Sequence, residues 1–162
     1  MDEKITQKFK QLLKEASKAD KQVIELLIEG VLRKQSSLNG SYLGGILGTK
    51  SRLTDNNQYE MIIPNTELIQ NSLQIVHGGI TATLLDSAMG SLVHYNLPVG
   101  AAAVTSEMKI NYLAPGKGSE LKCIASIIHQ GSKIVVTEGK VYREDGKLIA
   151  HATGSFFVIK RN

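Results

Sequence analysis

Residues 79–94, GITATLLDSAMGSLVH, restrict the possible folds of this chain more than any other segment. When this segment is drawn as a helix, apolar side chains occur on nearly every side, and such a helix is normally buried. After Pro98 and Gly100 the chain continues as four strand-like runs, at residues 102–113, 121–129, 134–143 and 148–159. We therefore expect an α+β fold in which an antiparallel sheet wraps around one central buried helix.

Short turns between the four runs indicate how the strands pair. Residues 144–147, EDGK, place an Asp-Gly pair between two alternating runs, which is a strong hairpin signal. Residues 114–119, APGKGS, and residues 130–132, QGS, provide the other two reversals. Because short reversals join neighbouring antiparallel strands, we predict a meander in which each strand pairs with the next.

The first part of the chain has a helical pattern instead. Apolar residues recur at helix spacing through residues 1–37, which predicts one or two amphipathic helices with a break near residues 19–20. The glycines within residues 39–45 predict the end of this helical segment. We therefore expect two parts, a helical extension at residues 1–40 and a main domain at residues 41–162.

A hairpin is predicted between the extension and the central helix. Its strands are expected at residues 46–53 and 59–63, with a turn at residues 55–57 and Pro64 as the stop. Cys123, the only cysteine, lies in an apolar alternating run, which favours a buried and reduced thiol.

Charge and composition exclude several classes of function. The net charge of +4 is scattered, and no Lys/Arg cluster with interleaved aromatic residues indicates nucleic-acid binding. A modest positive balance does suit an anionic ligand. The charged first residues lack the apolar segment of a signal peptide, and no run of 18 apolar residues exists. We therefore expect a cytoplasmic protein without a membrane span.

Asp86 is the residue that most strongly suggests chemistry. It lies within the most apolar helix of the chain, too far from the helix start to act as a cap. An ionised carboxylate there must be paired, protonated or exposed to a functional cavity. The residue is therefore either a structural carboxylate or a catalytic one, and its position alone does not decide.

The segment before the helix favours the catalytic interpretation. His77-Gly78-Gly79 stands immediately before the apolar run, where backbone N–H groups and the positive end of the helix dipole can stabilise an oxyanion. Asn71, six residues before His77, can orient a water molecule or a carbonyl group. A glycine pair alone is more often a simple turn.

The combined pattern Asn71-x5-His77-Gly78-Gly79-x6-Asp86 resembles the motif of hotdog-fold acyl-CoA thioesterases of the phenylacetate-degradation (PaaI-like) type. The similarity continues through residues 104–125 and covers roughly residues 43–159, so it leaves the helical extension unexplained. It implies the hotdog fold, hydrolysis of an acyl- or aryl-CoA thioester to free acid and CoA, and no metal or cofactor.

The resemblance also implies a role for each residue of the site. Asp86 matches the family's essential carboxylate, acting as general base on water or as nucleophile. The Gly78 amide matches the oxyanion donor, and Asn71 and His77 match residues that position the carbonyl or the water. Thr105 matches a hydroxyl that helps to hold the water. Strand alternation, however, predicts that Thr105 shares the more polar face of its strand with Glu107 and Lys109.

Helix geometry adds a constraint on the number of chains in the site. Gly78 and Asp86 are eight residues apart in the sequence, roughly 12 Å along a helix at about 1.5 Å per residue. One thioester carbonyl cannot contact both within one chain. We therefore expect a homodimer or homotetramer whose site takes Gly78 from one subunit and Asp86 from another, as the resembling family does.

Two other functions compete with this prediction. A hotdog domain can bind acyl-CoA without hydrolysing it, as a ligand sensor, although a pure binder has little use for Asp86 opposite an oxyanion site. A hotdog dehydratase or hydratase would need a different acid–base pair. No G-x-S-x-G motif indicates a serine hydrolase, and the histidines show no metal-ligand spacing. The acyl group, and the choice between CoA and acyl carrier protein, stay open.

Overall fold

The computed structural model describes residues 2–161, and the chain divides into two compact units, Met1–Gly48 and Thr49–Asn162. The second unit contains a six-stranded sheet and one long helix, α4 (Gly78–Asn96). A single 3-10 turn, η1 (Glu67–Ile69), precedes this helix. Within its described residues, the first unit contains helices and no strand. Each unit is described separately below.

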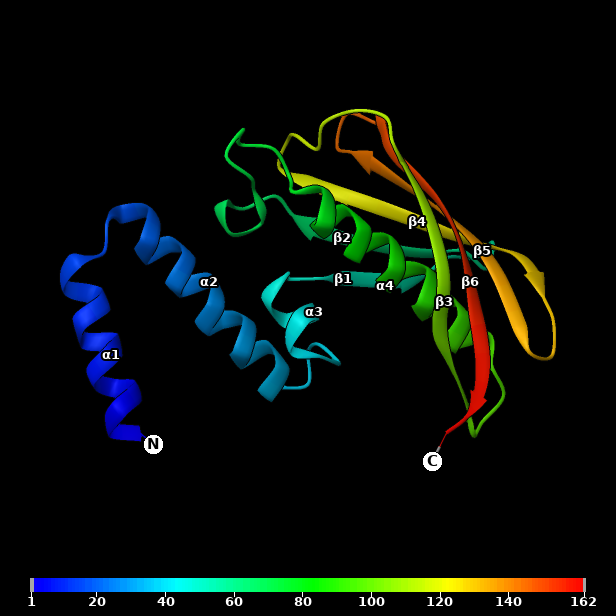
Figure 1. The fold of residues 1–162 in the computed structure, drawn as a ribbon, viewed down its shortest axis with the longest axis horizontal. Helices are drawn as coiled ribbons and strands as arrows, with labels where there is room; N and C mark the ends of the chain where they lie inside the picture. The colour runs from blue at the N-terminus through cyan, green and yellow to red at the C-terminus, as the bar shows by residue number, and fades with distance from the viewer. Residues whose placement is uncertain (1, 162) are drawn as a thin grey trace. The chain divides into compact units, whose positions relative to one another are not determined.

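All neighbouring strands of the sheet are antiparallel. The sheet order is β1-β2-β4-β5-β6-β3, which places β1 and β3 at the two edges. The strands are β1 (Lys50–Leu53), β2 (Tyr59–Pro64), β3 (Ala101–Tyr112), β4 (Glu120–Gln130), β5 (Ile134–Arg143) and β6 (Leu148–Lys160). Figure 1 shows α4 lying along one face of this sheet, where it contacts the strands. The predicted antiparallel sheet around a buried helix is confirmed.

The predicted meander is wrong at its first step. β3 pairs with β6, from Ala101 opposite Lys160 to Tyr112 opposite Ala150, and not with β4, which follows it in sequence. The intervening segment is a crossover, because the sheet order places β6 and β5 between β3 and β4. The Leu113 N–H donates to the Ile149 carbonyl, and the Gly116 carbonyl accepts from Val76. Turn residues mark a reversal but do not identify the partner strand.

The helix α4 forms the core together with the inner face of the sheet. Seven of its residues are buried: Thr81, Leu84, Leu85, Ala88, Met89, Leu92 and Val93. A Cβ atom at Gly139 on β5 would lie 2.9 Å from a Leu85 methyl carbon, so the missing side chain lets the helix approach the sheet closely. Cys123 is buried as predicted, and burial raises the pKa of its thiol to about 12.

The first unit consists of α1 (Asp2–Glu15), α2 (Lys18–Gln35) and the short α3 (Tyr42–Ile46). The predicted helical segment is confirmed over its described residues, while Met1 lies outside them. The break comes at residues 16–17, slightly before the predicted position. It falls there because Ser17 caps α2 in a reciprocal pair with Asp20.

The prediction that the glycines at residues 44–45 mark the end of the helical region is wrong. Both glycines lie inside α3. Ser41 caps this helix through a hydrogen bond from the Gly44 N–H. Gly45 packs against Gly30 of α2, where a Cβ atom on either residue would collide with the other helix. The predicted strand at residues 46–53 is therefore shorter and begins at Lys50, although the hairpin with β2 is confirmed. None of the helices within residues 2–161 has the length and apolar character needed to cross a membrane.

Candidate active site

Asp86 projects from the middle of α4 beside the edge strand β3. Its neighbours Leu85 and Ala88 are buried, whereas Asp86 itself is only partly buried. The Thr105 hydroxyl donates a hydrogen bond of 2.7 Å to Asp86 Oδ1. Within the described residues, Asp86 Oδ2 has no hydrogen-bond partner. One carboxylate oxygen is thus held in place while the other is left for a substrate or a water molecule.

A β-bulge brings Thr105 to Asp86 and contradicts the predicted alternation. Thr105 lies opposite the buried Phe156, whereas Glu107 lies opposite Ser155, because the register shifts between Thr105 and Glu107. Residues opposite each other share a face, and neighbours in a strand point to opposite faces. Thr105 therefore faces α4, and Glu107 and Lys109 face away from it. Such a bulge commonly re-aims a side chain at a functional site.

Gly78, the predicted oxyanion donor, is the first residue of α4. His77 is the N-cap residue, and its Nδ1 atom accepts a hydrogen bond of 3.0 Å from the Gly79 N–H. The Ile80 and Thr81 N–H groups bond to the His77 carbonyl. No group within residues 2–161 accepts a hydrogen bond from the Gly78 N–H. This amide is therefore free to donate to an oxygen that approaches the positive end of the helix dipole.

Tyr112, a residue that the sequence did not single out, holds the Gly78 peptide. Its hydroxyl donates a hydrogen bond of 3.0 Å to the Gly78 carbonyl. A Cβ atom at Gly78 would also lie 3.6 Å from the Tyr112 ring. This contact connects the end of β3 to the first residue of α4, so β3 contacts both the Asp86 and the Gly78 ends of the candidate site. No sequence signal reveals the contact, since it depends on the course of β3.

Asn71 stabilises the loop that leads into α4. Its Oδ1 atom accepts a hydrogen bond of 2.9 Å from the Leu73 N–H, and its backbone bonds to Ile75 and Gln74. Gln74 completes the tight turn with a positive φ of 57°. The Asn71 oxygen is thus used within its own loop, and no hydrogen bond joins Asn71 or His77 to Asp86 in the part of the chain that the structure describes.

The predicted residues therefore form two groups within one chain. Asp86 and Thr105 form one group, and Gly78 with His77 forms the other at the start of the same helix. Their separation along α4 is roughly 12 Å at about 1.5 Å per residue, too far for one carbonyl to reach both. Among residues 2–161, no three His, Cys, Asp or Glu side chains are arranged to hold a metal ion.

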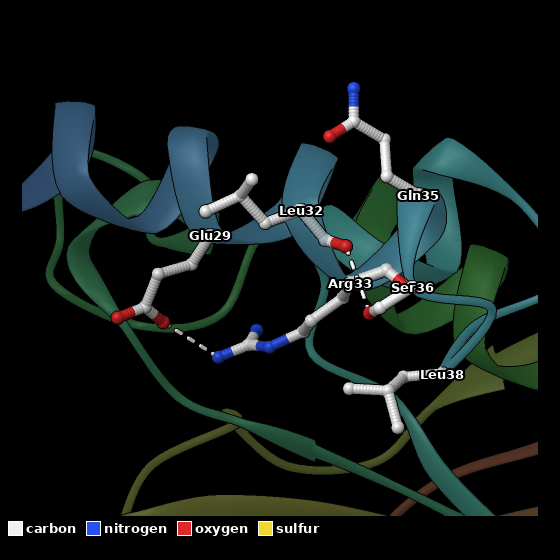
Figure 2. A pocket seen from close by; sticks show the side chains of 6 residues that line it. All are labelled: Glu29, Leu32, Arg33, Gln35, Ser36 and Leu38. Atoms are coloured by element: carbon white, nitrogen blue, oxygen red, sulfur yellow. Dashed lines mark hydrogen bonds and ion pairs between the residues drawn. The ribbon is translucent and has the colours of Figure 1, made fainter.

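The helical unit has a hollow of its own, which is unrelated to these residues. It is an open depression of about 490 Å³ lined by Glu29, Leu32, Arg33, Gln35, Ser36 and Leu38 (Figure 2). Figure 2 shows the Glu29–Arg33 ion pair, at 2.7 Å, and the Ser36 hydroxyl bonded to the Leu32 carbonyl. The charged and hydroxyl groups of Glu29, Arg33 and Ser36 are thus paired within α2 and its cap.

Comparison with known proteins identifies the family. The thioesterase superfamily model matches residues 73–150, which include His77, Gly78, Asp86 and Thr105. A candidate esterase from Halobacterium salinarum is 31% identical over 137 residues, covering 78% of this chain and 90% of the relative. A medium/long-chain acyl-CoA thioesterase from Salmonella typhimurium is 28% identical over 97 residues, covering 52% of this chain and 63% of that protein.

A solved structure is similar over almost the whole chain. The crystal structure of a Bacillus halodurans protein with CoA has 43% sequence identity and a TM-score of 0.87, and it covers 95% of this chain and 99% of its own. The chain belongs to the thioesterase superfamily and has its hotdog fold. The predicted class of enzyme, a thioester hydrolase, is confirmed at that level.

Proposed function

We propose that this protein hydrolyses an acyl-CoA thioester at a site formed by Asp86 and Thr105 of one subunit and the Gly78 amide of another. The observation that carries the proposal is the arrangement around Asp86. This carboxylate, next to buried residues of α4, has one oxygen bonded to Thr105 and the other free of partners among the described residues. Thr105 thus holds the carboxylate in position while its second oxygen can act on a substrate or a water molecule.

Three observations support CoA as the carrier of the acyl group. The Bacillus halodurans structure at 43% identity contains CoA, and the Salmonella typhimurium relative is an acyl-CoA thioesterase. The net charge of +4 also favours an anionic ligand. Whether the acyl group is an aryl or an aliphatic acid depends on a pocket that two subunits would complete.

The proposed chemistry uses two features of the site. Asp86 accepts a proton from water while the water oxygen forms a bond to the thioester carbonyl carbon. The negative charge that develops on the carbonyl oxygen is stabilised by the Gly78 N–H at the start of α4. The C–S bond then breaks, which yields the free acid and the CoA thiolate. Direct attack by Asp86 on the carbonyl would use the same two groups.

The edge strand β3 supports a site shared between two subunits. One side of β3 pairs with β6 and the other side is an edge of the sheet. Long unpaired edges are normally covered or paired in native proteins. Pairing of β3 with its copy in a homodimer would place Thr105 and Tyr112, which contact the two halves of the site, at the interface. A homotetramer would contain two such dimers.

Complementation between two inactive variants tests this proposal. Asp86→Asn removes the carboxylate, and Gly78→Pro removes the oxyanion donor. Proline suits this position because Gly78 is the first residue of α4 and His77 has the extended conformation preferred before proline. Each variant alone should lose about a hundredfold or more of its turnover. Gly78→Ala, which keeps the amide, should retain much more activity than Gly78→Pro.

Coexpression of the two variants with different affinity tags gives purified heterodimers. If each site takes Gly78 from one subunit and Asp86 from the other, one intact site forms in every heterodimer. Turnover per heterodimer should then approach half of the wild-type value. Heterodimers as inactive as the two parents would contradict the shared site.

A further inference from the structure

The apolar side of α1 is not covered by the other described helices of its own unit, α2 and α3. The exposed fractions of Ile5, Phe9, Leu12 and Leu13 are 60%, 37%, 48% and 38%, and no residue of the helix is buried. Isolated apolar residues on a surface are normal, but a continuous stripe usually marks an interaction site. A helix of 14 residues is also marginal in water without a packing partner.

The spacing of the stripe is that of a helix pair. Ile5, Phe9 and Leu12 are separated by four and then three residues, and Ala16 follows four residues later, directly after the helix. Alternating steps of three and four residues form the contact seam of a coiled coil. In an antiparallel pair, Phe9 would lie opposite the partner's Leu12, and Ile5 opposite the partner's Ala16.

The charges favour an antiparallel partner of the same sequence. The first turn of α1 is acidic, and its last turn carries one lysine and one glutamate, Lys14 and Glu15. In the register above, Lys14 lies opposite the partner's Gln7, so the complementary charges are those that flank the seam. The same register brings Lys8, which flanks the seam, close to the partner's Glu15. The helix dipoles also oppose each other favourably in this arrangement.

We propose that α1 is a self-association surface that pairs in antiparallel fashion with α1 of a second copy of this chain. The inference does not depend on the proposed catalytic function. The Bacillus halodurans structure covers 95% of this chain and therefore most of the helical unit. The extension is thus part of that protein as well.

An anionic lipid surface is the main alternative occupant, and the charge of α1 disfavours it. The helix has four lysines, Lys4, Lys8, Lys10 and Lys14, and three acidic residues, Asp2, Glu3 and Glu15, which gives 4 − 3 = +1. Helices that lie on membranes usually combine an apolar face with a strongly basic polar face. The acidic residues of α1 instead complement its own lysines.

Disulfide cross-linking of full-length chains tests the proposal directly. Lys8→Cys and Glu15→Cys chains, carrying different tags, are coexpressed and then mildly oxidised. The native Cys123 does not interfere because it is buried and burial raises its pKa to about 12. We expect a mixed disulfide that joins the two differently tagged chains, and little linkage when only one of the two variants is present. A Gln7→Cys and Gln11→Cys pair, on the polar side of α1, is the matched control and should stay unlinked.

A second pair of substitutions shows whether the seam drives the association. Phe9→Lys with Leu12→Lys, added to both cysteine variants, should abolish the mixed disulfide without unfolding the chain, since both side chains are exposed. No mixed disulfide in the original variants, equal linkage of the Gln7 and Gln11 control, or linkage that survives the lysine substitutions would overturn the proposal. So would binding to phosphatidylglycerol vesicles that Phe9→Lys with Leu12→Lys abolishes while chains remain unlinked in solution.

Discussion

The helices α4 and α1 show two different uses of apolar residues in one chain. α4 is apolar on nearly every side, buries seven residues and packs on one face of the sheet of its own unit, residues 49–162, the thioesterase unit. α1 has one apolar stripe, buries no residue and leaves that stripe exposed. The thioesterase unit therefore completes its core within one chain. The helical unit does not, and its stability is expected to depend on a partner.

The largest effect on stability should come from truncating α4. Leu85 is fully buried against the sheet, so Leu85→Ala should lower the free energy of unfolding by about 2–5 kcal/mol. Leu12→Ala on α1 is the matched control. At protein concentrations low enough to leave α1 unpaired, its cost in the free energy of unfolding should stay at about 0.5 kcal/mol, the usual surface value. Urea denaturation followed by circular dichroism measures both. Equal costs would mean that α1 is packed as tightly as α4.

The glycine contact between α2 and α3 should produce a smaller and local effect. Gly45→Ala places a Cβ atom against the Gly30 carbonyl, and such overpacking costs about 1–3 kcal/mol. Hydrogen exchange should increase in α3 while α4 keeps its protection. Gly40→Ala is the control because no atom lies within 4 Å of its Cβ position. Faster exchange throughout α4 would show that the two units unfold together.

The contact between Tyr112 and Gly78 should influence turnover more than stability. Tyr112→Phe keeps the ring but removes the hydrogen bond to the Gly78 carbonyl. The loss of a bond worth about 1 kcal/mol should reduce kcat by up to roughly tenfold if the Gly78 peptide loses its alignment. Steady-state kinetics should show the change in kcat with little change in KM. Tyr95→Phe, at an exposed position, should leave both constants unaltered.

The smallest effect concerns Glu138 on the sheet. Burial would raise the pKa of this carboxyl, but hydrogen bonds from Lys140 and His151 outweigh it and lower the pKa below the ordinary 4.5. The resulting stabilisation is present above pH 4.5 and is lost as the pH falls through the lowered pKa.

Glu138→Gln should therefore reduce the loss of unfolding free energy that the thioesterase unit suffers on acidification. The reduction should be less than about 1 kcal/mol, the usual contribution of such a surface pair. Melting temperatures of wild type and variant between pH 6 and pH 3, roughly the range around the ordinary carboxyl pKa, measure the difference. Parallel curves for the two proteins would show that the network does not contribute.

Much of the thioesterase unit could be predicted because its signals are local. The all-round apolar character of α4 and the turns at residues 130–132 and 144–147 placed the helix and the last three strands within a few residues of their observed bounds. Asp86 was evident because a carboxylate in an apolar helix is costly without a partner.

The remaining features depend on long-range pairing, which leaves little trace in sequence. The pairing of β3 with β6 depends on a crossover whose residues resemble an ordinary turn. No glycine in the sequence marks the bulge after Thr105. The bulge turns Glu107 and Lys109 to the face of the strand opposite to that of Thr105. The Tyr112 contact follows only from that register. In the helical unit, Gly44-Gly45 suggested a turn because close helix packing and turns favour the same residue.

The rate of thiol release from a panel of acyl-CoAs, compared between wild type and Asp86→Asn, tests the central claim most directly. Asparagine has nearly the same volume and can still accept a hydrogen bond from Thr105, so the folded variant isolates the carboxylate. We predict turnover of at least one acyl-CoA by wild type and a loss of about a hundredfold or more in the variant. Turnover that Asp86→Asn leaves intact would contradict the proposed role of this carboxylate.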